Sequence, residues 1–183
     1  MERQEAYELM KEKVKNKNLR KHMLAVEAVM RRLAAHLGQD VEKWGLAGLL
    51  HDLDYDFTCD APEKHSLVAG EMLEEMGVDA EIVKAVKAHN SYHGLPRETL
   101  MDHALYAADP LTGLIVAAAL IHPEKKLAPL DVAFVMNRFK EKQFARGADR
   151  EQIRSCCELG LELEDFVGMG LEAMQKVSRD LGL

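Results

Sequence analysis

Leu49-Leu50-His51-Asp52-Leu53-Asp54-Tyr55-Asp56 is the stretch that decides the fold of this chain. It ends an apolar run that begins near Trp44 and passes directly into acidic residues. An imidazole and a carboxylate at the inner end of an apolar helix are costly to bury unless they are paired or bind a metal. The stretch therefore predicts a polar site at the end of a buried helix.

Other potential metal ligands recur at helix-sized intervals on both sides of this stretch. They are His22, His65, His89 and Asp109. Imidazole and carboxylate together suit Fe, Mn, Co, Ni or Zn better than Mg or Ca, so the donor set predicts a divalent transition metal. The three cysteines contain no Cys-x-x-Cys pair, which rules out a sulfur-rich zinc finger.

Nearly every segment has the period of a helix. Apolar residues spaced by three and four predict a helix from about Leu19 to Gly38, with His22 at the border of its buried stripe. Asp40 is expected to cap a helix that runs into His51. No stretch alternates with period two for long, so no sheet is expected. The predicted fold is all-α, a single-domain helical bundle.

Capping patterns predict where several later helices begin. Asp60-Ala61-Pro62-Glu63 has the composition of a helix start, which would place His65 in the first turn. Thr99 opens a long helix that contains Asp109 followed by Pro110, and proline there is expected to kink the helix. Further helices are expected at about 130–140, 149–159 and 163–181.

Composition limits the function classes. The 183 residues fit one domain over 1–183, and the net charge of −7 argues against a nucleic acid polymer as partner. The charged start does not resemble a signal peptide, and the apolar run 114–121 is too short to span a bilayer. We therefore expect a cytoplasmic protein without a membrane partner, and a homodimer remains an option.

The ligand pattern resembles the HD superfamily of metal-dependent phosphohydrolases. His22, His51, Asp52 and Asp109 match its four-ligand signature, and His65 with His89 completes the six-ligand version found in two-metal branches. The resemblance implies an HD-like metal-binding core over 19–113 and a C-terminal helical extension over 114–183 packed on it. Branches that read His-Asp-Ile-Gly-Lys carry a lysine where this chain has Tyr55, so that phosphate contact is not carried over.

The resemblance also implies roles for these residues. The first metal would be held by His22, His51, Asp52 and Asp109, and the second by His65, His89 and a bridging Asp52. Two ions are favoured over one, and Asp52 and Asp109 are the expected catalytic residues. The implied reaction is phosphomonoester or phosphodiester hydrolysis of a small phosphorylated compound, a nucleotide or dinucleotide.

Each candidate also has a structural alternative. His65 would otherwise be an exposed first-turn residue, and His89 a helix-end histidine favoured by the dipole. Weaker candidates for substrate contact are Lys64, Asn90 and His93. Asp54 and Asp56 would support the ligands, act as general acid or base, or simply end a helix. The basic segment Arg138–Arg146 is interpreted as a capping or interface element rather than a nucleic-acid arm.

Two other functions stay open at this point. Some relatives with six ligands hold a mixed-valent di-iron centre and use oxygen to cleave carbon–phosphorus or carbon–carbon bonds. A regulatory binding module with a metal but little turnover is the other alternative. Dependence of turnover on oxygen would separate the oxygenase from the hydrolase.

Overall fold

The computed structural model describes all 183 residues as helices, turns and loops, with no strand, which confirms the all-α prediction. The first six helices are α1 (Arg3–Lys13), α2 (Lys17–His36), α3 (Val41–Leu50), α4 (Tyr55–Thr58), α5 (Leu67–Glu75) and α6 (Ala80–His89). The rest are η1 (Ser91–His93), α7 (Leu100–Ile121), α8 (Val132–Lys140), α9 (Arg150–Arg154), η2 (Ser155–Leu159), α10 (Leu163–Lys176) and α11 (Ser178–Leu181).

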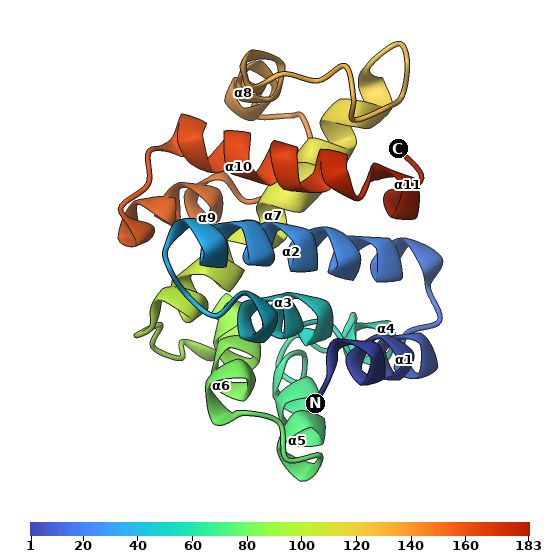
Figure 1. Cartoon of the computed structure of the whole chain (residues 1–183), viewed down its shortest axis with the longest axis vertical. Helices are drawn as coiled ribbons and strands as arrows, with labels where there is room; N and C mark the ends of the chain where they lie inside the picture. Colours follow the sequence, from blue (N-terminus) through green and yellow to red (C-terminus); the bar gives the residue numbers. More distant parts are fainter.

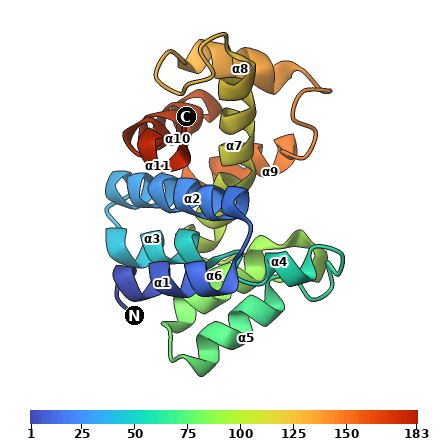
Figure 2. The same cartoon turned by 90° about the vertical axis from the view of Figure 1, so that its right-hand side faces the viewer.

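Two long helices, α2 and α7, organise the bundle. Figure 1 shows α2 lying between α3 on one side and α10 on the other, and both neighbours contact it. Figure 2 shows α7 running from the layer of α8 past α2 toward α6, which it contacts. One cluster of 52 buried apolar residues extends from α1 to α11, so the C-terminal helices share a core with the first half of the chain.

Helix α7 is long and apolar enough to cross a membrane, with a mean hydropathy of 1.8 in its most apolar window. In the folded chain 61% of that window is buried against other helices. Such burial is typical of the central helix of a helical core, and α7 also carries two aspartates, Asp102 and Asp109.

The close approach of α2 and α3 depends on Gly48. A Cβ at this position would lie 2.9 Å from backbone atoms of Val26 and Glu27, a distance that real Cβ contacts do not reach. Glycine therefore allows the two backbones to touch. The contact places the first turns of α2, with His22, beside the end of α3, where His51 follows.

The predicted helix start at 60–63 is wrong. Helix α5 begins only at Leu67, after a series of turns in which Ser66 has a φ of +72°. The Asp54 carboxylate accepts the backbone N–H groups of Ser66 and Ala69 at 2.8 and 3.0 Å. A residue from a distant turn thus caps the helix in place of the local capping box, and His65 lies before α5.

Two of the predicted C-terminal helices are each divided into two shorter helical segments. The expected helix over 149–159 is the short α9 followed by the 3₁₀ turn η2, and 163–181 divides into α10 and α11. Within the basic segment Phe139 is buried, whereas Lys140, Lys142 and Arg146 are exposed. The Arg150 guanidinium donates to the carbonyls of Ala145 and Ala148 at 2.9 and 2.6 Å. Arg150 thereby holds the loop that follows α8.

Pro110 lies inside α7 without ending it. Because proline has no N–H, the carbonyl of Tyr106 loses its usual helical donor. The side-chain amide of Gln152 donates to this carbonyl at 2.8 Å. Gln152, in α9, therefore replaces the missing backbone hydrogen bond and ties the C-terminal extension to the middle of α7.

We predict that Gln152→Leu lowers the free energy of unfolding by about 1–3 kcal/mol, because it leaves the Tyr106 carbonyl without a donor. Pro110→Ala restores a backbone donor, so the same substitution in that background should cost less, with a coupling of at least about 0.5 kcal/mol. Urea denaturation of the four metal-free proteins measures the cycle, with the exposed Gln143→Leu as control. Strict additivity of the two substitutions would contradict this account.

Candidate metal centre

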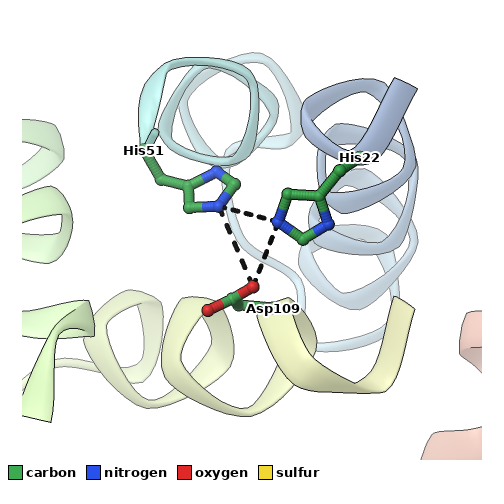
Figure 3. Close-up of side chains that lie close together, drawn as sticks. All are labelled: His22, His51 and Asp109. Atoms are coloured by element: carbon green, nitrogen blue, oxygen red, sulfur yellow. Dashed lines mark hydrogen bonds and ion pairs between the residues drawn. The ribbon is translucent and has the colours of Figure 1, made fainter. Parts of the chain in front are cut away.

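The six predicted ligands come together at one place from separate segments of the chain. Figure 3 shows His22 of α2, His51 at the end of α3 and Asp109 of α7 pointing toward one another. Asp52 follows His51, and His65 precedes α5, while His89 is the last residue of α6. The side chains of His51 and His89 are only 0% and 2% exposed. The cluster is therefore an assembled site within the core.

The two oxygens of Asp52 face different pairs of histidines. Its Oδ2 lies 3.6 Å from Nε2 of His22 and 3.4 Å from Nε2 of His51. Its Oδ1 lies 3.5 Å from Nε2 of both His65 and His89. The carboxylate thus stands between two halves of the cluster, which is the geometry that a bridging ligand requires.

Asp109 completes the first half. Its Oδ1 lies 3.1 Å from Nε2 of His22 and 4.0 Å from Nε2 of His51. Ligands bound at about 2.0–2.2 Å from one ion are separated by about 2.8–3.6 Å in octahedral or tetrahedral geometry. Two triads have ligand atoms within 4.8 Å of one another, His22 with His51 and Asp109, and His51 with Asp52 and His89.

In each of the four clustered histidines, the Nδ1–H group donates a hydrogen bond to an acceptor outside the centre. Nδ1 of His51 donates to the Gly48 carbonyl at 2.9 Å, and Nδ1 of His89 donates to the Val86 carbonyl at 2.6 Å. These carbonyls belong to helix ends, where backbone acceptors lack intrahelical partners. Nδ1 of His65 donates to Asp54 Oδ1 at 2.9 Å.

His22 follows the same rule through a hydroxyl. The Thr112 hydroxyl donates to the Asp109 carbonyl at 2.9 Å, so its oxygen accepts from Nδ1 of His22 at 3.1 Å. In their neutral form, all four imidazoles therefore present an unprotonated Nε2 to the centre. Nε2 of His22 and His51 lie only 3.2 Å apart, a separation that fits either a shared proton or a metal ion bound by both nitrogens. The donor set fits a divalent transition metal.

The charges of the metal-free cluster are strongly coupled. Burial opposes ionisation of Asp52, but the neighbouring His51 and His89 hold the pKa of Asp52 well below its usual value. Burial likewise opposes protonation of His22 and His89, yet Asp109 raises the pKa of His22 and Asp52 raises the pKa of His89. Without a metal, protons on the imidazoles would balance the carboxylates.

Two supporting residues stand behind the ligands. Asp54 is fully buried and accepts hydrogen bonds from His65, Ser66 and Ala69, so its role is to orient His65 and start α5. Thr112 was missed in the sequence, where a threonine three residues after Asp109 has no distinctive signal. Asp56 lies elsewhere and accepts from the backbone N–H of Asn16 at 3.0 Å.

Of the weaker candidates for substrate contact, two form hydrogen bonds within the protein and one is exposed to solvent. Asn90 Nδ2 and His93 Nε2 approach the carbonyl of His65 at 3.1 and 2.8 Å, and so hold the turn that carries this ligand. Lys64 is exposed beside that turn. Tyr55 packs edge-on against the His65 ring with centroids 5.0 Å apart and is 41% exposed. Substrate contacts by Lys64, Asn90 and His93 stay predictions.

We predict that Thr112→Val weakens metal binding about 10–100-fold, because the orienting acceptor of His22 is lost while side-chain volume is kept. Thr112→Ser keeps the hydroxyl and should bind metal nearly as the parent does. Calorimetric titration of metal-free protein with Mn²⁺ measures both affinities. Equal affinities for the valine and serine variants would show that this hydrogen bond does not orient the ligand.

We predict that the metal-free protein loses stability as the pH rises from about 6 into the alkaline range. The pKa of His22 and His89 is raised, so their stabilisation is complete below 6.5 and disappears as the pH passes their folded-state pKa. The pKa of Asp52 and Asp109 is lowered, so their stabilisation holds above 3.8 and is lost only in stronger acid.

Excess Mn²⁺ should reverse this slope, because metal ligation requires neutral imidazoles. Thermal melts across this pH range, with chelator or with Mn²⁺, measure both effects, and the exposed His36→Gln should leave them unchanged. Rising stability of the chelated protein toward alkaline pH would refute the prediction.

Comparison with known proteins agrees with this geometry. The model of the HD domain family matches residues 19–120. Ribonuclease Y of Lawsonia intracellularis is 32% identical over 103 residues, which cover 56% of this chain and 20% of that protein. Ribonuclease Y of Fervidobacterium nodosum is 30% identical over 138 residues, or 73% of this chain and 26% of that protein.

The chain thus corresponds to only about a quarter or less of the length of these relatives. No solved structure matches the chain. The family match covers more than half of the chain and includes all six clustered ligands. The resemblance seen in the sequence is therefore confirmed, and the chain belongs to the HD domain family, within the superfamily of metal-dependent phosphohydrolases.

Proposed function

We propose that this protein hydrolyses a phosphoester bond in a small phosphorylated compound of nucleotide type, in the cytoplasm and with two metal ions. The observation that carries the proposal is the convergence of four histidine Nε2 atoms and two carboxylates on one buried centre. Asp52 supports two ions over one, since each of its oxygens faces its own pair of histidines.

A divalent metal bound there would lower the pKa of water from about 15.7 to about 7 and polarise a phosphoryl oxygen. The chain itself fixes the side from which a substrate can approach the metal centre. The side chains of His22 and Asp109 are 25% and 28% exposed, whereas His51 and His89 are closed off. A cavity of about 330 Å³ adjoins His22 and Asp109, so the phosphoryl group would arrive from this side.

Asp109 has a suitable atom for proton transfer on that side. Its Oδ1 pairs with His22, while its Oδ2 accepts no hydrogen bond from the protein. Oδ2 would therefore hold the proton released from the attacking water. Asp52 is nearly closed off, with a side chain 9% exposed, and serves to position the metals.

A second candidate substrate is RNA. The relatives are named ribonuclease Y, and ribonucleases act on phosphodiester bonds, which belong to the same reaction class. The net charge of −7 favours small substrates over a long polyanion for this chain. Assays of mononucleotides, dinucleotides and oligoribonucleotides side by side would separate the two candidates.

We predict that His51→Ala or Asp52→Ala removes bound metal and abolishes phosphate release while helix content stays near that of the parent. Both residues are central to the cluster, and Asp52 faces both halves. Metal analysis, circular dichroism and a phosphoester panel with Mn²⁺ measure the three properties. The exposed Asp60→Ala is the control. Full metal content and full turnover in either active-site variant would disprove the assignment.

We predict that turnover does not need oxygen. Hydrolysis consumes water only, so phosphate release under strict anaerobiosis should equal that in air, with a pH–rate profile rising through an apparent pKa of about 7. The assay uses purified protein loaded with Mn²⁺. Activity that vanishes without oxygen and returns with it would support the di-iron oxygenase instead, and metal binding without any turnover would support the regulatory module.

A further inference from the structure

Three of the twelve glycines, Gly113, Gly147 and Gly168, could carry a Cβ without displacing a neighbouring atom. Five others have a positive φ, and in four more an added Cβ would lie less than 3.0 Å from a neighbouring atom, whereas at Gly168 the nearest contact is an ordinary one of 3.4 Å to Val132. Gly113 and Gly147 fall in neither group, because a Cβ on either would point into open space. Gly113 is also inside α7, where glycine destabilises a helix relative to alanine.

Both of these glycines line the cavity beside the metal centre. This cavity of about 330 Å³ is bounded by His22 and Asp109 on one side and by Gly113 and Gly147 on the other. Gly147 belongs to the loop that Arg150 holds through the carbonyls of its neighbours Ala145 and Ala148. Small residues therefore occur where a side chain would narrow the space in front of the ligands.

A second cavity shares two lining residues, His22 and Gly113, with the first. Its volume is about 430 Å³. Its walls are mainly apolar, with Val116, Leu120, Leu181 and Leu183, while Asn18 and Lys21 also line it. From the shared residues we infer one groove over Gly113, which reaches from the metal ligands to a mainly apolar pocket.

We propose that Gly113 and Gly147 keep this groove open for the organic group of the phosphoester substrate, a ring of apolar character. This inference rests on the proposed hydrolase function and adds to it the part of the substrate that does not react. The phosphoryl group occupies the first cavity, and the ring crosses Gly113 into the apolar pocket. Lys21 is placed to pair with an acceptor or anionic substituent on the ring.

Two phosphonates test the groove without turnover, because their carbon–phosphorus bond is not hydrolysed. Methylphosphonate has only the head group, and benzylphosphonate adds an apolar ring. Calorimetry with the full Mn²⁺-loaded chain under nitrogen should show benzylphosphonate binding at least about tenfold more tightly, since the ring is removed from water. Gly113→Leu should abolish this difference, with a larger loss of affinity for benzylphosphonate than for methylphosphonate.

Gly113→Ala is the matched control, because its methyl group enters open space without filling the groove. It should keep the preference for the ring. Leu120→Asp places a charge in the apolar pocket at an exposed position, and carries the test if the helix variant does not fold. Circular dichroism and metal content are measured for every variant.

The outcomes separate the groove from the hydrolase function. Equal affinities of the two phosphonates for the parent protein, or an unchanged preference in folded Gly113→Leu and Leu120→Asp, would overturn the groove and leave the hydrolase proposal standing. Failure of the metallated protein to bind either phosphonate would count against the proposed function itself, and the groove inference would fall with it.

Discussion

Every imidazole of the cluster donates its Nδ1 proton away from the centre, and the function of the whole structure depends on this. In the neutral form of the rings, the consequence is a set of four Nε2 lone pairs that converge beside two carboxylates, with two nitrogens only 3.2 Å apart. A protein interior does not tolerate such a set without a cation. The orientation of the rings thus specifies the chemistry before any substrate is considered.

The fold supplies these acceptors from places that also stabilise it. The carbonyls of Gly48 and Val86 are at helix ends, where hydrogen-bond acceptors are free, and Gly48 also lets α3 touch α2. Asp54 orients His65 and at the same time caps α5. Thr112 links His22 to the backbone of α7. The same contacts therefore stabilise the helical bundle and orient the metal ligands.

Sequence alone predicted the all-α class and the six residues that converge, because helical period and the His51-Asp52 motif are local signals. Three of the four acceptors behind the ligands were beyond it, since two are backbone carbonyls and Thr112 has no distinctive neighbour pattern, whereas Asp54 was already a candidate supporting carboxylate. The start of α5 was predicted wrongly because its cap, Asp54, comes from 13 residues earlier than Leu67. The groove over Gly113 also depends on residues from both halves of the chain, which only the tertiary structure brings together.

The wide spacing of the ligands, from His22 to Asp109, has a consequence for the life of the protein in the cell. An unfolded chain does not hold these residues together, so the metal binds the native state and draws the folding equilibrium toward it by mass action. Free metal at about 1,000 times its dissociation constant would add about 4.1 kcal/mol, a large share of the stability of an ordinary domain. Metal supply would then set how much of the protein escapes proteolysis, and not only how fast it works.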